Sequence, residues 1–338
     1  MRFPSLPPYP LSDVLSAVRL DGAVYIDAEF TAPWCVETQF GLHTARTELP
    51  TSDHIVLFHL LTHGTCFARL AKGQEVVRVK AGDLLLLTND DLHVLCSDLR
   101  LPTEGMGSFP PAEGGLLELR HGGGGEATRF ICGYLACDRH ASRSLFSSLP
   151  PMLRLELGDI SLGGWLGDLL RLGVSESRDQ KPGAQSLLAK LSELAFTEAL
   201  RRYAQSGAPE LKGWLAGLRD PFVGRALALL HGQPTRDWSV EELAREVAMS
   251  RSALAERFNS MIGEPPMHYL SRWRLTLAAQ ALRRSAEPIA LVAERSGYES
   301  ETSFTRAFKR EFGMPPTVWR RTGGHGPADS SPGRPIPD

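Results

Sequence analysis

The stretch FNSMIGEPPMHY, from Phe258 to Tyr269, returns later in the chain as FKREFGMPPTVW, from Phe308 to Trp319. The copies match phenylalanine, glycine, a proline pair and a final aromatic residue at an offset of 308 − 258 = 50 residues. An upstream match at an offset of 49 pairs Leu243-Ala244 with Val292-Ala293 and Ala248 with Gly297, so the second copy has one additional residue in its turn. Each copy therefore predicts a helix, a short turn and a second helix, which is the pattern of a helix-turn-helix unit.

Capping residues mark where these helices begin. Ser239 has Glu242 three residues later, which is the arrangement of a capping box. Ser250 and Ser300 precede the second helix of each copy, where a serine hydroxyl can accept a hydrogen bond from a backbone N–H group that lacks a helical partner. Pro288 stands where the first helix of the second copy begins. The repeat thus predicts its own helix boundaries.

The second helix of each copy has one apolar and one polar face. Helical spacing predicts a buried face formed by Leu254, Phe258 and Met261 or Ile262 in the first copy, and by Phe304, Phe308 and Phe312 in the second. The outward residues are Ser252, Ala255, Glu256 and Asn259 in the first copy, and Thr302, Ser303, Arg306, Lys309 and Arg310 in the second, with Glu301 at the helix start. Hydroxyl and cationic groups can bind base edges and phosphates, so these faces predict a DNA-binding surface.

Two helical hairpins could instead form part of a protein-interaction solenoid. Such arrays need three or more repeats to bury a continuous core, whereas this chain has two copies. The polar outer face of the second copy also favours DNA.

The segment from about 219 to 321 closely resembles the AraC/XylS family of transcription regulators. The resemblance lies in Gly297-Tyr298-Glu299-Ser300, Phe304, Phe308-Lys309, Phe312-Gly313 and Pro315-Pro316. It implies a seven-helix domain in which a long helix, about Pro266 to Arg284, holds two recognition helices in successive major grooves roughly 34 Å apart. It also implies base contacts from Ser252, Ala255, Glu256, Glu301, Thr302, Ser303 and Arg306, and phosphate contacts from Arg251 and Lys309.

One departure affects the first recognition helix. Ala255 and Glu256 occupy positions where many relatives carry long polar or basic side chains, whereas Arg306 is the expected arginine. A carboxylate at Glu256 repels phosphate but can accept a hydrogen bond from a cytosine amino group. We therefore expect the second helix to dominate base recognition.

The first half of the chain is rich in short strands. Strands are predicted over Val24–Phe30, Ile55–Thr62, Thr65–Leu70, Glu75–Val79, Asp83–Thr88 and Thr128–Cys137, and a mobile loop over Pro102–Glu126. Close spacing of such strands predicts an antiparallel sandwich or small barrel. Apolar residues at helical spacing predict an amphipathic helix over Gln185–Tyr203, which could pack on this domain or pair two subunits.

This half resembles the cupin-like sensor domains that precede some AraC-type DNA-binding domains. The likeness rests on Trp34, Phe58-His59-Leu60, Gly64, Ala81-Gly82-Asp83, His93 and Ile131-Cys132-Gly133. The two histidines one residue apart that mark the first cupin motif are absent, so we expect structural histidines and no bound metal. A metal-dependent cupin enzyme fused to a DNA-binding domain is the alternative, although no catalytic residues or nucleotide-binding motifs are recognisable.

Five cysteines, an odd number without a CxxC pair, argue against a disulfide framework and a structural zinc site. Some relatives with this sensor type respond to oxidants through cysteines, and Cys35 and Cys132 lie in the matching segments. A thiol-based redox sensor is therefore a further alternative, which requires an accessible thiol of lowered pKa. Trp34, Cys35, His59, His93 and Cys132 are the candidate ligand-sensing or redox-sensing residues.

Charge is unevenly distributed along the 338 residues. The range 219–321 has 16 Lys+Arg and 12 Asp+Glu, a net of +4, which leaves 37 − 16 = 21 against 39 − 12 = 27, a net of −6, elsewhere. A mildly basic segment fits a DNA-binding module. There is no signal-peptide pattern, and the apolar runs are too short to cross a bilayer, so we expect a cytoplasmic, nucleoid-associated protein.

The sequence thus predicts an α+β multidomain protein with four parts. These are a cupin-like β-barrel sensor over 11–160, connecting helices over 161–212 that are candidates for dimerisation, an all-α DNA-binding domain with two helix-turn-helix units over 219–321, and a disordered tail over 322–338. We expect a one-component transcription regulator that binds promoter DNA and responds to a small ligand or an oxidant. A homodimer and RNA polymerase are the further expected partners, and no cofactor is expected.

Overall fold

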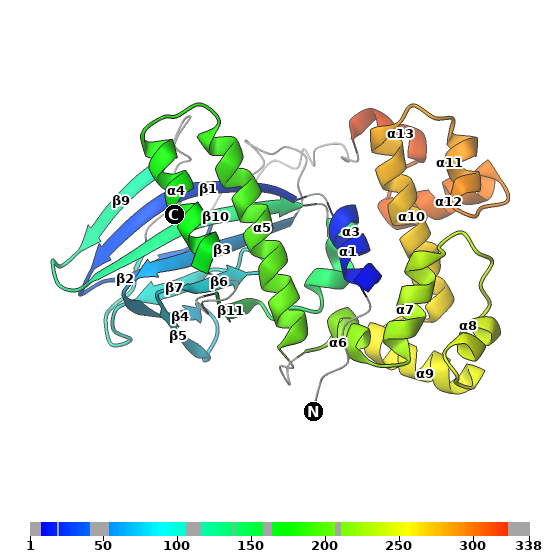
Figure 1. Ribbon diagram of the computed structural model, residues 1–338, viewed down its shortest axis with the longest axis horizontal. Coiled ribbons are helices and arrows are strands. Elements are labelled where there is room, and N and C mark those ends of the chain that lie inside the picture. Colours follow the sequence, from blue (N-terminus) through cyan, green and yellow to red (C-terminus); the bar gives the residue numbers. More distant parts are fainter. Residues whose placement is uncertain are drawn as a thin grey trace, which may run out of the picture. The chain divides into compact units, whose positions relative to one another are not determined.

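The chain divides into two structural units in the computed structural model (Figure 1). The structure describes residues 8–18, 20–40, 54–105, 116–137, 139–157, 164–206 and 211–323. One unit contains Val18–Ala216, and the other joins Met1–Ala17 to Gly217–Asp338. The tail predicted over 322–338 lies, from residue 324 onward, outside the described residues.

The first unit contains two β-sheets that face each other across one apolar core. The six-stranded sheet has the order β11-β6-β3-β10-β1-β9, with β1 Leu20–Thr31, β3 His54–His63, β6 Asp83–Leu87, β9 Leu117–Gly122, β10 Ala127–Cys137 and β11 Met152–Glu156. The five-stranded sheet has the order β5-β4-β7-β2-β8, with β2 Cys35–Thr38, β4 Thr65–Leu70, β5 Val76–Lys80, β7 His93–Cys96 and β8 Glu104–Gly105. The predicted cupin-like barrel is present as this pair of sheets, which do not join into one closed sheet.

Alternation along the strands decides which side chains enter the core. Ile26, Ala28 and Phe30 of β1 point inward together with Phe130 and Cys132 of β10. The intervening residues of these strands face the other side of the sheet, because successive side chains of a strand point to opposite faces. This alternation places a row of polar side chains on the outer face of the six-stranded sheet.

The stretch Pro102–Glu126, predicted as a loop of little structural importance, contains two strands, which is a correction. Leu117 and Leu119 of β9 pack against the core while Glu118 and Arg120 alternate with them. β9 pairs in parallel with β1, from Ile26 to Thr31. The many glycines of this stretch favoured a loop prediction, although Leu117–Gly122 alternates between more and less buried residues as a strand does.

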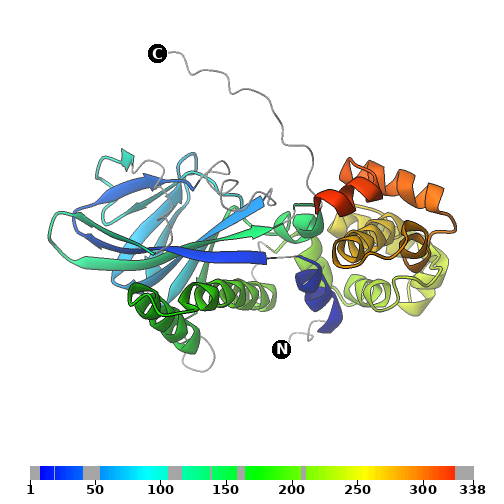
Figure 2. The same ribbon diagram turned by 90° about the horizontal axis from the view of Figure 1, so that it is seen from above.

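Two helices lie along the outer face of the six-stranded sheet (Figure 2). α5, Ala184–Gln205, packs on β1, and α4, Gly164–Arg178, packs on α5. The shorter α3 spans Arg139–Phe146, and the boundary between the units falls inside α6, Gly213–Arg219. The helix predicted over Gln185–Tyr203 is α5, although its Leu187 and Leu194 are exposed rather than packed.

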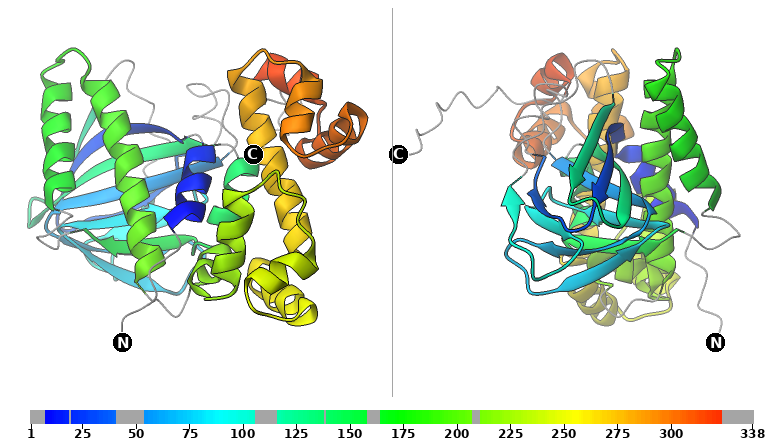
Figure 3. Two further views of the ribbon diagram at one scale, coloured as in Figure 1. Left: turned by 45° about the vertical axis from the view of Figure 1, so that its right-hand side comes forward. Right: turned by 90° about the vertical axis from the view of Figure 1, so that its left-hand side faces the viewer.

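The second unit is entirely helical within its described part. Its helices are α7 Val223–Gly232, α8 Val240–Glu246, α9 Arg251–Ile262, α10 Pro266–Arg284, α11 Ile289–Arg295, α12 Glu301–Phe312 and α13 Pro316–Thr322. The predicted long helix is α10, with the same first and last residues. α9 lies beside the first turns of α10, and α12 lies near its other end (Figure 3).

The N-terminal helix α1, Pro8–Ala17, also belongs to the second unit. It packs against α7 and α10, and its Val14 and Ala17 are buried. Gln280 of α10 donates a hydrogen bond to the carbonyl oxygen of Ser16 at 2.9 Å. Residues 11–17, which the predicted sensor boundary included, therefore pack with the helical unit, while the remaining domain boundaries stay a prediction.

Candidate functional site

The caps of the two recognition helices form as the sequence predicts. The Ser250 hydroxyl accepts from the backbone N–H of Ala253 at 3.2 Å, and the Ser300 hydroxyl accepts from that of Ser303 at 3.2 Å. Upstream, the Ser239 hydroxyl accepts from the backbone N–H of Glu242 at 3.1 Å, so Ser239 caps α8.

Aromatic and aliphatic side chains fix the inner faces of both helices. Leu254 and Phe258 of α9 are buried, and Phe304, Phe308 and Phe312 of α12 are buried as well. The second copy has the larger aromatic cluster, since Phe308 also packs against Trp319, whose indole N–H donates to the Ala279 carbonyl at 3.1 Å. The predicted inner faces are confirmed, except that Met261 and Ile262 are only half-buried.

The predicted DNA-contacting residues gather on two exposed surfaces. On α9, Arg251, Ser252 and Glu256 are exposed and Ala255 is half-buried. On α12, all five predicted residues are exposed, namely Glu301, Thr302, Ser303, Arg306 and Lys309. Their contacts with DNA stay a prediction, although the structure brings each set together on one helix face.

The exposed polar side chains differ in whether they already have a hydrogen-bond or ion-pair partner within the chain. Arg251 pairs with Glu241 at 2.9 Å, and both side chains are more than half exposed. The Ser303 hydroxyl donates to the Ser300 carbonyl at 2.8 Å, so it already supports the helix start. Within the described part of the chain, Arg306 and Lys309 form no ion pair and can meet an incoming polyanion without first losing a partner.

An ion pair anchors α9 to the start of α7. Arg257 donates from Nε to both carboxylate oxygens of Asp220, at 3.0 and 2.9 Å. Asp220 also accepts from the backbone N–H groups of Phe222 and Val223 at 3.0 and 2.9 Å. Burial opposes ionisation, but these hydrogen bonds outweigh it and lower the pKa of the Asp220 carboxyl. Arg257 is thus an anchoring residue of α9.

Three of the five predicted sensing residues form one buried chain of hydrogen bonds. His59 Nδ1 lies 2.9 Å from Cys132 Sγ, His59 Nε2 lies 2.8 Å from His93 Nε2, and His93 Nδ1 lies 2.9 Å from the carbonyl oxygen of Asp91. A carbonyl only accepts, so His93 Nδ1 carries a proton, and its Nε2 accepts from His59. His59 Nδ1 then accepts from the Cys132 thiol.

Burial keeps every member of this chain neutral. Desolvation and the neighbouring His93 hold the pKa of His59 well below its ordinary value, and desolvation lowers the pKa of His93 to about 4. Desolvation likewise raises the pKa of the Cys132 thiol. The described residues include no group of three or more His, Cys, Asp or Glu side chains placed to hold a metal ion. The arrangement is that of a satisfied polar network within an apolar core.

The other two predicted sensing residues lie apart from this chain. Trp34 stacks with Phe30 at a ring-centroid distance of 4.7 Å inside the core, and its buried indole N–H has no hydrogen-bond partner among the described residues. Cys35 occupies the opposite face of β2, in a separate small cluster with Val94 and Cys96. The structure therefore places the five residues at three different locations.

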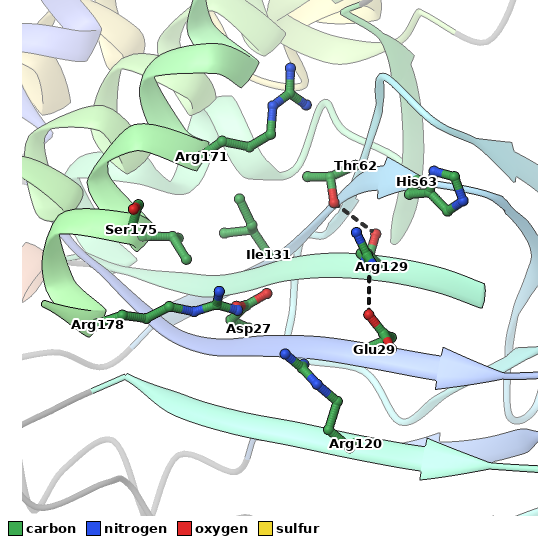
Figure 4. A pocket seen from close by; sticks show the side chains of 11 residues that line it. Asp27, Glu29, Thr62, His63, Arg120, Arg129, Ile131, Arg171, Ser175 and Arg178 are labelled. Atoms are coloured by element: carbon green, nitrogen blue, oxygen red, sulfur yellow. Dashed lines mark hydrogen bonds and ion pairs between the residues drawn. The ribbon is translucent and has the colours of Figure 1, made fainter. Parts of the chain in front are cut away.

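A polar cleft on the outer face of the six-stranded sheet was not predicted (Figure 4). It has a volume of about 430 Å³ and lies between α4 and the strands β1, β3, β9 and β10. Its charged lining consists of Asp27, Glu29, Arg120, Arg129, Arg171 and Arg178, with His63 nearby. The signal that could have found it is the alternation of charged and apolar residues along β1, β9 and β10.

Ion pairs hold much of this charge in place. Arg129 Nε donates to Glu29 at 2.6 Å, and Arg178 pairs with Asp27 and, at 3.0 Å, with Glu118. The arginine side chains remain 40–56% exposed, so these pairs contribute little stability and their guanidinium groups stay available to solutes.

Two protein-family models and several transcription regulators are similar in sequence to this chain. The sequence model described as "Cupin" matches residues 10–205, and the one described as "Helix-turn-helix domain" matches residues 243–322. An AraC-like transcription regulator of Streptomyces antibioticus is 34% identical over 272 residues, which cover 80% of this chain and 88% of the relative. One from Streptomyces lividans is 32% identical over 316 residues, which cover 92% and 98%.

The chain belongs to the AraC-like transcription regulators. This AraC-like regulator therefore binds DNA through its helix-turn-helix units and is not an enzyme. The cupin match identifies the two-sheet unit as its N-terminal domain. No helix within the described part of the regulator is both long and apolar enough to cross a membrane.

Proposed function

We propose that this AraC-like regulator recognises its operator by inserting α9 and α12 into two successive major grooves. The observation that carries the proposal is a pair of capped helices, each with a buried stripe and an exposed outer face, near opposite ends of α10. α10 has 19 residues, which at a rise of 1.5 Å per residue span about 28 Å. That length is comparable with the roughly 34 Å between successive grooves on one face of a duplex.

The two helices are proposed to contribute unequally. Arg306 and Lys309 of α12 provide unpaired cations for a guanine edge and for phosphate, whereas α9 presents Glu256 beside the short side chain of Ala255. Arg251 must exchange Glu241 for a phosphate, which is a small cost for an exposed ion pair.

Genome-wide immunoprecipitation of the tagged regulator, followed by footprinting of the strongest site at stated salt, tests this proposal. We expect discrete intergenic sites at the nucleoid, with protection of two major-groove segments one helical turn apart. Arg306→Ala should weaken protection of the α12 segment, whereas Arg100→Ala, which removes an exposed arginine of the two-sheet unit, should bind as the native protein does. Uniform binding along DNA would contradict the proposal.

We further propose that the regulator is a homodimer joined through α4 and α5. Trp165, Leu169 and Leu172 follow helical spacing on α4 and are 37–51% exposed, while Leu187 and Leu194 are 37% and 40% exposed on α5. Large apolar side chains that recur along one helical stripe are typical of a subunit interface. Leu187 and Leu194 have the spacing of core residues on α5, yet they do not pack against β1, and a subunit interface would bury them.

Sedimentation equilibrium tests the dimer. Leu172→Glu should give monomers, since it places a carboxylate in the apolar stripe. Arg171→Glu, one residue away at an exposed position that faces the cleft, is the control and should leave the dimer intact. A native protein that is monomeric at micromolar concentration would contradict the interface.

The two-sheet unit is proposed to act as the sensor and to bind a small ligand next to Trp34. The DNA-bound regulator is separately proposed to contact RNA polymerase. The unpaired indole N–H of Trp34, 3% exposed in an aromatic cluster, supports a ligand that accepts a hydrogen bond. A screen of metabolites by thermal unfolding should find a stabilising ligand whose effect is lost in Trp34→Phe, which keeps an aromatic ring but lacks the donor. An unchanged stabilisation in that variant would contradict the site, and in vitro transcription with purified polymerase tests the second partner.

A further inference from the structure

Cys35 and Cys96 lie directly opposite each other on neighbouring antiparallel strands. The register of β2 and β7 pairs Cys35 with Cys96 and Val36 with Leu95. Just beyond this pair, the Ser97 N–H donates to the Trp34 carbonyl at 2.9 Å. Hydrogen-bonded and non-hydrogen-bonded pairs alternate in an antiparallel ladder, so Cys35 and Cys96 form a non-hydrogen-bonded pair.

That position suits a disulfide bond. The Cα atoms of a non-hydrogen-bonded pair are about 4.5 Å apart, with the side chains close together. Disulfides join residues whose Cα atoms are roughly 4.4–6.8 Å apart. Both cysteines are reduced here, and their side chains lie in one small cluster with Val94. Little backbone movement would be needed to join the two sulfur atoms.

The pair lies on the outer face of the five-stranded sheet. Trp34, Val36 and Leu95 point into the core, so the alternating residues Cys35 and Cys96 point away from it. Their cover includes the partly buried Phe67 and Leu101, and the Cys35 thiol lies 3.8 Å from the exposed Thr103 hydroxyl. By contrast, Cys66 and Cys132 lie inside the core. A small oxidant can thus approach Cys35 by displacing part of a surface segment.

The two sulfur atoms differ in chemical character. Burial and the neighbouring Cys35 thiol raise the pKa of the Cys96 thiol to about 12. Arg69 and Asp98 also face Cys96, and their charges act in opposite directions. Cys96 therefore keeps its proton. Cys35 is the more exposed of the two and lies 3.8 Å from the hydroxyl of the exposed Thr103, so it is the sulfur that a peroxide reaches first.

We propose that Cys35 and Cys96 are a peroxide-reactive dithiol that closes to a disulfide across β2 and β7. The Cys35 sulfur attacks the peroxide, the O–O bond breaks, and a Cys35 sulfenic acid and one water form. The Cys96 sulfur then displaces the hydroxyl group of the sulfenic acid, which leaves as the second water with the Cys96 proton. Two thiols are oxidised to one disulfide and one peroxide is reduced to two waters.

The disulfide would close a loop of 96 − 35 = 61 residues and tie β2 to β7. The segment after β2 is already held to the segment before β7, because the Phe40 N–H donates to the Asp90 carboxylate at 3.0 Å and the Gln39 amide donates to the Asp90 carbonyl at 2.8 Å. The bond therefore adds a covalent link at the other end of the same ladder. This site goes beyond the proposed function, since its chemistry requires neither DNA nor the proposed ligand.

Peptide mapping of the full chain tests the dithiol directly. The reduced protein is treated with an equimolar amount of hydrogen peroxide, blocked with N-ethylmaleimide and digested with trypsin. Cys35 and Cys96 are each the sole cysteine of their tryptic peptides, residues 20–46 and 81–100. We expect these two peptides to be joined by a bond that dithiothreitol cleaves, with two of the five thiols lost.

Serine variants and unfolding curves complete the experiment. Cys35→Ser and Cys96→Ser should each abolish the joined peptides, while Cys66→Ser should leave them unchanged, and circular dichroism checks that each variant is folded. The oxidised native protein should unfold at a higher temperature than the reduced one, and Cys35→Ser should show no such difference. Bonds that include Cys66 or Cys132, or irreversible oxidation of Cys35 without a joined peptide, would overturn the proposal.

Discussion

The two recognition helices share a framework and differ in their outer faces. At the 50-residue offset, Ser250 corresponds to Ser300 and Phe258 to Phe308, so caps and cores repeat. On the outer face, Glu256 corresponds to Arg306, which reverses the charge. The comparison teaches that buried and capping residues determine where a recognition helix lies, while a few exposed side chains determine what it can bind.

Loss of a core phenylalanine should have the largest effect on this comparison. Phe308→Ala and Phe258→Ala each remove a fully buried ring and should cost about 3–5 kcal/mol of unfolding free energy. We expect the larger loss at Phe308, because its ring packs against three aromatic rings, those of Phe304, Phe312 and Trp319, whereas among the described residues the Phe258 ring packs against that of Tyr269. Urea unfolding followed by the helical circular dichroism signal measures both, and a larger loss at Phe258 would contradict this ranking.

The outer faces should differ in DNA binding. Arg306→Ala should weaken binding to the native site by about 1–3 kcal/mol and relax base preference at one position, because a guanidinium can bind a guanine edge through two hydrogen bonds. Gel shifts with single-base operator variants measure this change. Glu256→Ala, at the equivalent position of α9, is the matched comparison and should bind as tightly as the native protein or more tightly. Equal weakening on every sequence would make Arg306 a phosphate contact instead.

The caps should behave alike in both copies. Ser250→Ala and Ser300→Ala each leave a backbone N–H of the first helical turn without its partner, which should cost about 1 kcal/mol of stability. Glycine at the same positions should cost only a few tenths of a kcal/mol. The urea midpoints of the four variants provide the measurement. A clear difference in stability between the two alanine variants would show that the two caps are not equivalent, although the sequence repeats them.

A pH-dependent difference should separate α9 from α12. Arg257 pairs with Asp220, whereas Ala307 occupies the equivalent position of α12. The folded-state pKa of Asp220 is lowered, so this stabilisation is present above its unfolded pKa near 3.9 and is lost as the pH falls through the folded value. Asp220→Asn can still cap α7 but removes the charge, and it should cost about 1 kcal/mol or less at pH 7, because Arg257 is partly exposed.

Urea midpoints of native protein and Asp220→Asn, compared between pH 7 and pH 3, give the measurement. The difference between the two proteins should shrink toward pH 3. A constant difference over this range would mean that the carboxylate charge does not stabilise α9.

Local signals explain how much of the molecule the sequence predicts. Ser239, Ser250 and Ser300 cap the helices that the repeat predicts, since capping depends on residues only three positions apart. β2 and β7 were missed because four residues are too few to show alternation. Residues close together in the sequence therefore predict the helices of the second unit better than they predict the strands of the first.

The sensor site depends on strand register, which the sequence does not display. His59 meets Cys132 across 73 residues because β3 pairs with β10 in one particular register, and it meets His93 across 34 residues through the core. Leu187 and Leu194 have the spacing of core residues, yet α4 and β1 leave them exposed. The sequence therefore identifies His59, His93 and Cys132 as candidate residues, whereas their hydrogen-bond partners are seen only in the fold.

The position of α1 has a consequence for how the chain folds during synthesis. α1 leaves the ribosome well before α7, which covers it and begins at Val223, about 200 residues later. Domains generally fold in order from the N-terminus, so the two-sheet unit can form while α1 still lacks its binding groove. A fragment that starts at residue 211 would carry both helix-turn-helix units yet leave that groove open to solvent. Stable production of the DNA-binding unit alone should therefore require that residues 8–17 be supplied as well.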